Sequence, residues 1–335
     1  ATQETGTGAM GQISTLLKAV IATSLSMQAF LAIMFLPRFL TMGIDPAHAV
    51  WDAVFMAISV FNNAGFVILP GGLEPHVTDW WMLIPIILGT TVGAIGFPVI
   101  MDVAKNMWTP RRWRLHTKLT LSTYLILAFI GALALALTEW HNPATLGAVD
   151  TPSKILNAML AGVNSRSSGI SALNVGSMRS QTHFVQDILM MIGGGSASTA
   201  GGVKVTTFAV LVLAVIAEAR GDRDIETFGR RIPTSTVRLA VAVSLLGLAL
   251  VAISVVALLT MTDHSLDIIL FETVSAFATV GLSTGITPNL PVAAKYVLIA
   301  LMFAGRTGSM TVAAALALRE RSRVIRMPEE QPIIG

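Results

Sequence analysis

The sequence predicts an all-α integral membrane protein made of tandem parallel repeats, each a membrane span, a short re-entrant helix and a second span. Two observations predict this class. Of the 335 residues, 53% are hydrophobic and only 12% are charged, with a mean hydropathy of +0.72, whereas a soluble domain carries about 25% charged residues. The apolar runs are also longer than the roughly ten residues that a β-barrel strand needs.

The apolar runs recur in one order, which divides the chain into three repeats. Each repeat has a run long enough to span the bilayer, a run too short to span, a glycine-containing turn and a second long run. Parallel repeats of this kind often surround an axis along the membrane normal. The predicted spans are 16–36, 80–107, 117–137, 184–217, 237–261 and 291–318, and the short runs are 47–61, 154–163 and 266–278. The predicted boundaries are a polar cytoplasmic lead-in at 1–15, repeats at 16–109, 110–220 and 221–319, and a cytoplasmic tail at 320–335.

Lysine and arginine gather in three clusters between the repeats and at the end of the chain. By the positive-inside rule these clusters, and with them the carboxyl end, are predicted to be cytoplasmic. None has the interleaved aromatic residues that stack on bases, so we expect no nucleic-acid partner. The clusters are Lys105, Arg111, Arg112, Arg114 and Lys118; Arg220, Arg223, Arg230, Arg231 and Arg238; and Arg319, Arg321, Arg323 and Arg326.

The turns after the three short runs are predicted to form the selectivity filter of a cation pore. A re-entrant helix directs its carboxyl end, with about half a negative charge, at the membrane centre. The following turn can then present backbone carbonyls that replace an ion's hydration shell, and glycine permits the tight backbone that this needs. One glycine after an apolar run is usually a helix cap, but Gly65, Gly169 and Gly281 recur at matched positions, 104 and 112 residues apart. The turns offer no Asp or Glu ring, which favours a monovalent cation such as K⁺, bound at filter residues only.

The predicted filter residues are Asn62, Asn63, Ala64, Gly65, Arg166, Ser167, Ser168, Gly169, Thr279, Val280, Gly281 and Leu282.

A second signal is a glycine-rich stretch inside the span at 184–217. Five glycines, two serines, a threonine and a lysine occur within twelve residues, and irregular backbone at membrane depth survives only where protein buries it or a wet cavity faces it. We interpret it as a gate loop in a pore. A Walker A phosphate loop needs Gly-Lys-Ser/Thr in succession, and here Val203 separates Gly202 from Lys204. The predicted gate comprises Gly193, Gly194, Gly195, Ser196, Ala197, Ser198, Thr199, Ala200, Gly201, Gly202, Lys204 and Arg306.

Three charged residues lie near these sites, and two of them allow an alternative interpretation. Arg306 interrupts the last span, where an arginine costs roughly 2.5–3.5 kcal/mol on insertion scales. We expect it to hold the gate loop closed, the alternative being that it snorkels to the inner headgroups. Arg166 either braces a filter turn through backbone carbonyls or faces the outer water. Lys204 is expected to reach the cytoplasmic mouth.

Several motifs together resemble the Trk/Ktr/HKT superfamily of potassium transporters, and most closely the membrane subunit of bacterial Ktr systems. The resemblance covers nearly the whole chain, and the glycine-rich motif is its most specific part. It implies four span–pore helix–span repeats around one ion path, with one filter turn per repeat and the gate loop in the third. The motifs are Asn62 to Phe66, Gly194 to Lys204, Phe228 to Pro233, Ser275 to Gly285, and Gly305-Arg306.

The chain departs from that pattern because only three repeats are present. They match the family's second, third and fourth repeats, so the first repeat and its filter turn are missing from the amino end. The middle turn, Ser167 to Ile170, also stands where the family often has Thr-Ala-Gly-Phe.

The resemblance further implies a homodimer in the bacterial inner membrane, which is the plasma membrane, with a cytosolic ATP/ADP-binding regulatory ring of the RCK/KTN type. It implies K⁺ as the transported ion and Na⁺ as an activator, with no organic cofactor. The alternative function is a cation-coupled secondary carrier with alternating access, in which broken helices also bind ions. An enzyme is not expected, because the predicted spans contain no histidine and only Asp102 and Asp187, near span ends, as acids.

Overall fold

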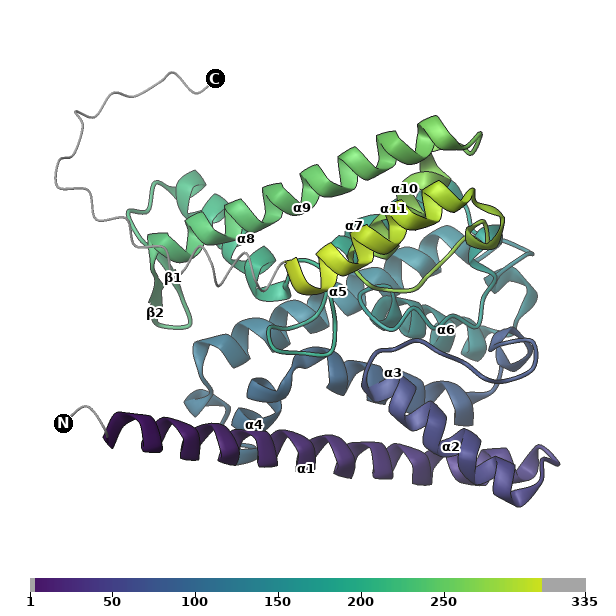
Figure 1. Ribbon diagram of the computed structural model, residues 1–335, viewed down its shortest axis with the longest axis horizontal. Helices are drawn as coiled ribbons and strands as arrows, with labels where there is room; N and C mark the ends of the chain where they lie inside the picture. The colour runs from purple at the N-terminus through teal and green to yellow at the C-terminus, as the bar shows by residue number, and fades with distance from the viewer. Residues whose placement is uncertain (1–3, 309–335) are drawn as a thin grey trace.

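A computed structural model describes the backbone of residues 4–308 and the side chains of residues 17–307. It forms three consecutive helical units (Figure 1). Unit one contains α1 (Glu4–Thr41), α2 (Pro46–Phe61), α3 (Trp80–Ile95) and α4 (Phe97–Lys105). Unit two contains α5 (Leu115–Glu139), α6 (Thr151–Asn164), α7 (Ser180–Met191) and α8 (Val205–Arg220). Unit three contains α9 (Thr234–Met261), α10 (Leu266–Phe277), α11 (Val292–Phe303) and the π-helix η6 (Ala304–Gly308).

Short elements lie in the connections. Five single-turn 3₁₀ helices occur at Glu74–His76, Pro110–Arg112, Leu146–Ala148, Val175–Ser177 and Thr287–Asn289. Between units two and three, β1 (Ile225–Thr227) and β2 (Arg230–Ile232) form an antiparallel hairpin that pairs Ile225 with Ile232. The motif from Phe228 to Pro233 therefore includes a strand and a turn, with Phe228 and Gly229 both at positive φ.

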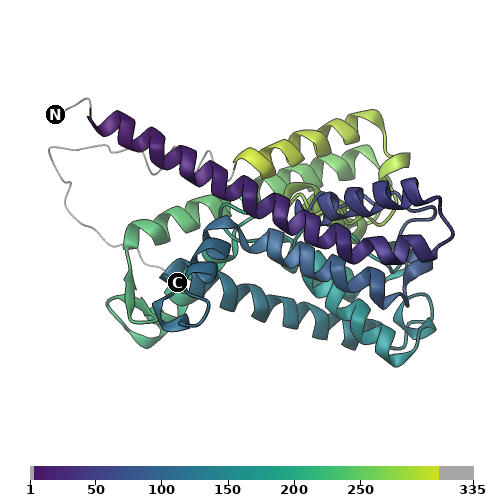
Figure 2. The same cartoon turned by 90° about the horizontal axis from the view of Figure 1, so that it is seen from below.

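The predicted all-α membrane class is confirmed, and the helix bounds show where the sequence interpretation needs correction. Within the predicted lead-in at 1–15, α1 is already helical from Glu4. No proline interrupts this segment, and each residue added to an existing helix gains one backbone hydrogen bond. The amino-terminal turns of α1 stand away from the rest of the molecule (Figure 2). The predicted tail, the end of the last span and the third basic cluster lie outside the described residues.

By length and composition, three described helices can cross a membrane: Leu17–Thr41, Leu115–Glu139 and Thr234–Met261. The span predicted at 80–107 is instead two helices, α3 and α4, bent by 96° at Gly96. Gly96 adopts a φ of +92°, and a Cβ there would lie 2.7 Å from the Ser196 carbonyl oxygen. Contact with the glycine-rich loop of unit two thus requires a glycine at the bend.

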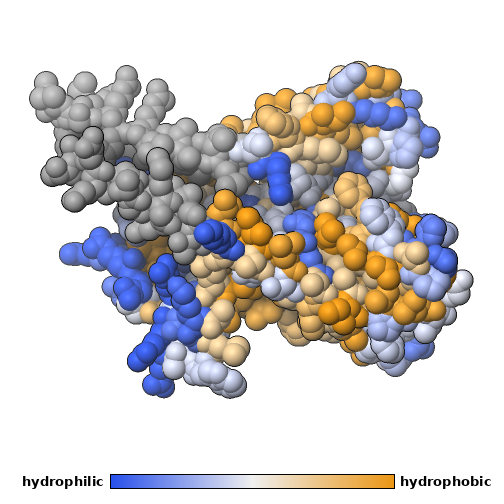
Figure 3. Space-filling model, turned by 60° about the horizontal axis from the view of Figure 1, so that its bottom comes forward, coloured by the Kyte–Doolittle hydropathy of each residue, from blue (hydrophilic) through white to orange (hydrophobic). Residues whose placement is uncertain are grey.

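Large apolar side chains remain exposed along the long helices. Examples are Ile33 on α1, Phe129 and Leu137 on α5, and Ile253 on α9, which are 67–74% exposed. Figure 3 shows hydrophobic residues over the middle of one face and hydrophilic residues gathered towards its two ends. A continuous apolar surface with polar ends is the arrangement that a bilayer requires.

Unit two packs between the other two units. The helix α3 of unit one packs on α6, while α7 and α8 pack on α10 and α9 of unit three. Two large apolar cores result, one within unit one and against α6, the other between units two and three. The two basic clusters within the described residues lie on one side, since Lys118 Nζ stands 5.9 Å from the Phe228 ring centroid.

Candidate ion pathway

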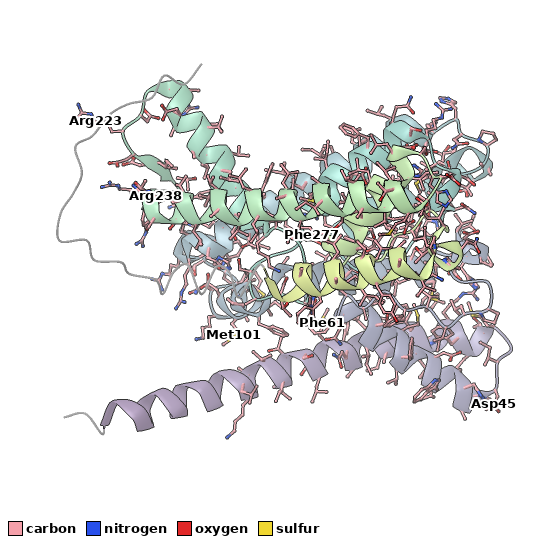
Figure 4. The ribbon with its side chains drawn as sticks, turned by 45° about the horizontal axis from the view of Figure 1, so that its top comes forward. Asp45, Phe61, Met101, Arg223, Arg238 and Phe277 are labelled. Carbon is pink, nitrogen blue, oxygen red and sulfur yellow. The ribbon has the colours of Figure 1, made fainter. Side chains whose placement is uncertain are left out.

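The three short helices end inside the molecule. Figure 4 places Phe61 and Phe277, the last residues of α2 and α10, between Asp45 at one end of the molecule and Arg223 and Arg238 at the other. Asp45 starts α2 by accepting hydrogen bonds from the backbone N–H groups of Ala47 and His48, as an N-cap aspartate does. The carboxyl ends of these helices, and their partial negative charge, therefore point at the interior.

The backbone closes each helix with the same kind of hydrogen bond. The N–H of Ala64 donates to Ser59 O at 2.8 Å, that of Val280 to Ser275 O at 3.0 Å, and that of Gly169 to Asn164 O at 3.3 Å. All three span five residues, one more than an α-helical bond. This shared ending shows that the three turns are structural repeats, although no strong sequence identity links them.

The turns need left-handed backbone at matched places. Asn63, Thr279 and Ser168 have φ of +52°, +51° and +77°, a region that non-glycine residues seldom occupy. Gly65 and Gly281 follow two residues after the first two of these, whereas Gly169 directly follows Ser168. The middle turn is therefore offset by one residue, which corrects the prediction that the three glycines are equivalent.

The three turns meet. A Cβ on Gly65 would overlap the carbonyl oxygen of Ser168, and one on Gly169 would overlap the carbonyl oxygen of Val280. A Cβ on Gly281 would lie 3.8 Å from the same Ser168 oxygen. Thus Ser168 O lies between the turns of units one and three, and Gly65 and Gly169 are required because backbone approaches backbone there.

Side chains of the short helices hold the far end of each turn. Ser59 Oγ donates to Phe66 O at 2.8 Å and Asn164 Nδ2 to Ile170 O at 2.7 Å. In unit three Ser275 Oγ instead accepts from the N–H of Gly281 at 3.2 Å. The polar residue thus sits six or seven positions before its partner in α2, α6 and α10, a signal that is present in the sequence.

The side chains of the remaining predicted filter residues differ in burial and in hydrogen bonding. Val280 and Leu282 are buried against the core of units two and three. The Asn62 side chain bonds to its own helix, because its Nδ2 donates to Ile58 O. Ser167 and Ser168 are buried, and their hydroxyls have no hydrogen-bond partner within the described part of the chain.

Arg166 does not face the outer water, because its side chain is 0% exposed. Its guanidinium carbon lies 3.6 Å from the ring centroid of Tyr124 on α5, a cation–π contact. Its three side-chain nitrogens donate no hydrogen bond to any residue that the structure describes. The predicted bracing through backbone carbonyls is therefore absent here, and stacking on Tyr124 takes its place.

The glycine-rich loop lies against the filter turns and the α3–α4 bend. The N–H of Gly195 donates to Ala94 O at 2.8 Å, and the Thr199 hydroxyl donates to Gly93 O at 3.0 Å. A Cβ on Gly201 would overlap Oγ1 of Thr279. The loop is closed at its base by a 2.8 Å bond from Gly193 N–H to Val203 O.

Thr199 is the residue at which the loop is tied to the other two units. Its hydroxyl accepts from Asn63 Nδ2 at 2.6 Å, and its carbonyl oxygen accepts from Nη1 of Arg306 in η6. The Arg306 contact with the predicted gate is thus present. Lys204 Nζ donates to Ala200 O at 2.7 Å within the loop, and that this residue reaches the cytoplasmic mouth stays a prediction.

A cavity lies on each side of the turns and the loop. One, of about 350 Å³, is lined by Gly169, Gly176, Glu74 and the segment from Gly281 to Gly285. The other, of about 340 Å³, is lined by Ser196, Ala197, Lys204 and the facing sides of α8 and α9. The filter turns and the loop therefore lie between two open volumes.

The sequence matches the family described as TrkH, "Cation transport protein", over residues 1–325. This chain belongs to that family. It is 38% identical to Ktr system potassium uptake protein B of Bacillus subtilis, over 99% of this chain and 73% of the relative, and 34% identical to the protein of the same name from Vibrio alginolyticus, over 84% and 62%. It is 32% identical to the potassium/sodium uptake protein NtpJ of Enterococcus hirae, over 91% and 67%.

The fold also matches a solved structure of the family. The potassium transporter TrkH from Vibrio parahaemolyticus aligns over 92% of this chain and 65% of its own length, with a TM-score of 0.70 and 18% identity. The predicted resemblance to a Trk/Ktr membrane subunit is therefore confirmed.

Proposed function

We propose that this TrkH-family chain conducts K⁺ into the cell through a channel-like pore whose filter is made of backbone carbonyls. The observation that supports the proposal most strongly is the meeting of three helix-end turns around Ser168 O, Gly65 and Gly281. Carbonyl oxygens at the negative ends of half-helices can replace the hydration shell of a monovalent cation. The names of the relatives, which are potassium uptake proteins, agree with this ion.

In this proposal four turns surround the ion, and the structure describes three of them. The position for the fourth turn lies opposite unit two, between units one and three. We infer that a fourth span–short helix–turn–span unit fills it, as the resemblance implies. In the same proposal, the loop from Gly193 to Lys204 is the gate on the inner side of the filter, and Arg306 holds it closed.

The partners in this proposal come from the family resemblance, and the basic side of the molecule offers them a surface. Arg223, Arg230 and Arg231 are exposed on and beside the β1–β2 hairpin, and a basic loop is favoured on the cytoplasmic side of the plasma membrane. We place there the docking surface for a cytosolic nucleotide-binding regulatory ring on a homodimer, with Na⁺ as an activator of transport.

The test is uptake of K⁺, Rb⁺ and Na⁺ into proteoliposomes that contain the purified protein. We expect K⁺ and Rb⁺ to enter down their gradients, with Na⁺ strongly disfavoured. Saturable flux with a fixed ion stoichiometry would instead favour the cation-coupled carrier. No flux of any of the three ions contradicts both.

Replacing Gly281 by serine is expected to lower the K⁺-over-Na⁺ preference about tenfold, a change of about 1.4 kcal/mol, while the protein still folds. A Cβ at this position has room, with its nearest neighbours 3.8 and 4.0 Å away. The φ of +98° is strained for serine, however, so the turn must adjust its carbonyls. The measurement is the ratio of K⁺ to Na⁺ uptake rates in proteoliposomes. An unchanged ratio would remove this turn from the filter.

A further inference from the structure

A buried carboxylate in α10 has no role in the pathway described so far. Glu272 is 4% exposed, and no lysine, arginine or histidine pairs with it among the described residues. A buried charge of this kind is costly unless hydrogen bonds satisfy it. Four do so here, which makes Glu272 the centre of a built site.

All four donors come from the segment that follows the filter turn of unit three. One carboxylate oxygen accepts from Ser283 Oγ at 2.8 Å and from the N–H and hydroxyl of Thr284 at 2.7 and 2.8 Å. The other accepts from Thr287 Oγ1 at 2.9 Å. We call the segment from Ser283 to Thr287 the outer lip. Hydrogen bonds to an ionised acceptor are stronger and shorter than neutral ones, so this carboxylate fixes the outer lip firmly.

The outer lip continues directly from Gly281 and borders the cavity of about 350 Å³ over the turns. On its other side the Thr284 carbonyl oxygen presses on Gly176 of unit two, where a Cβ would lie 2.6 Å from that oxygen. The outer lip is thus held between Glu272 on one side and Gly176 on the other.

Unit three alone has this carboxylate. Glu272 lies three positions before Ser275, whose carbonyl accepts the closing bond of its turn; three positions before the matching acceptors Ser59 and Asn164 stand Met56 and Ala161. Both are apolar residues. Units one and two therefore hold their turns with a single serine or asparagine bond, whereas unit three adds a charged clamp.

We propose that Glu272 is a positioning residue for ion selection: its carboxylate sets the outer lip, and through it the turn at Thr279 to Gly281. The inference rests on the proposed function. Glutamine in place of Glu272 keeps the size of the side chain but replaces an acceptor oxygen by an amide donor facing hydroxyl and N–H donors. The outer lip must then rearrange, and the turn that it continues loses its fixed geometry.

Unit two offers a matched control. Glu139 is also buried, at 0% exposure, and accepts from Asn142, Thr145, Thr182 and the Arg179 N–H. These donors belong to the outer loops of unit two and to the start of α7, not to a filter turn. Glu139→Gln therefore removes the same chemistry from a site whose hydrogen bonds, among the described residues, go neither to the outer lip nor to a filter turn.

The experiment measures K⁺ and Na⁺ uptake and thermal stability for the wild type, Glu272→Gln and Glu139→Gln in proteoliposomes, per amount of folded protein. We expect Glu272→Gln to lower the K⁺-over-Na⁺ ratio about tenfold and Glu139→Gln to leave the ratio unchanged while lowering stability. We expect Gly176→Ala, which pushes the outer lip from the other side without changing a charge, to lower the ratio as well.

If Glu272→Gln does not fold, Thr287→Val is measured in its stead, because it removes only one donor to the carboxylate. We then expect a smaller decrease in the K⁺-over-Na⁺ ratio. An unchanged ratio in the folded Glu272 or Thr287 variant overturns the inference, as does an equal fall in Glu139→Gln. A wild type that transports no K⁺ contradicts the proposed function itself, so the two failures are distinguishable.

Discussion

Replacing Gly65 by alanine is expected to reduce K⁺ uptake about a hundredfold or more, the largest effect that we predict for a single methyl group. Two costs combine at this position. Alanine at a φ of +79° loses about 1–2 kcal/mol to left-handed backbone strain. The new Cβ also overlaps the carbonyl oxygen of Ser168, and forced overlap in a packed site costs about 1–3 kcal/mol.

The overlap affects the proposed filter directly, because Ser168 O must move to make room for the new Cβ. The measurement is initial-rate Rb⁺ or K⁺ uptake in proteoliposomes, with melting temperature measured in parallel. Gly221→Ala is the control: Gly221 ends α8 at a φ of +72° with nothing within 4 Å of a Cβ. It should lose stability through strain alone and keep its uptake. Normal uptake by Gly65→Ala would show that this turn does not border the ion path.

The sequence predicted the elements whose causes are local. The short helices at 47–61, 154–163 and 266–278 agree with α2, α6 and α10 to within three residues at each end. Their beginnings follow from proline or aspartate at the first positions, and their ends from the turns that follow. The break in the span at 184–217 was likewise predictable, since five glycines weaken a helix wherever they stand.

The features that the sequence did not predict depend on tertiary contacts. The bend at Gly96 lies in an apolar run that reads as one helix, and it forms because Ala94 O and the backbone beside Gly96 meet the loop of unit two. The burial of Arg166 on Tyr124 joins residues 42 positions apart. Thr199 could be assigned to the loop from its motif, but its bonds to Asn63 and Gly93 join residues more than a hundred positions apart. Hydrophobic periodicity carries no information about such pairs.

Replacing Arg306 by alanine is expected to raise the K⁺ leak of the resting protein about tenfold. The Arg306 guanidinium donates to Thr199 O, and a hydrogen bond from a charged group contributes about 1.5–3 kcal/mol. Arg306 is exposed among the described residues, so solvent screening places its contribution at the low end of that range. A loss of about 1.4 kcal/mol from the closed state shifts its equilibrium tenfold towards open.

The direction of the effect separates a gate tether from the alternatives. If Arg306 only snorkelled to headgroups or merely stabilised the fold, its removal would leave flux per folded protein unchanged rather than raise it. Lys154→Ala is the control, since it also removes one charge and one bond to a backbone carbonyl, from Lys154 Nζ to Trp140 O at 3.0 Å. Its leak should match the wild type. Because Thr199 O accepts from Arg306 while the Thr199 hydroxyl bonds to Asn63 and Gly93, Arg306→Ala leaves both hydroxyl bonds in place, together with the bond from Gly195 N–H to Ala94 O. We therefore expect a leak through a loosened gate that still discriminates K⁺ from Na⁺, whereas loss of both closure and selectivity would mean that the loop and the filter turns are one structure and not two.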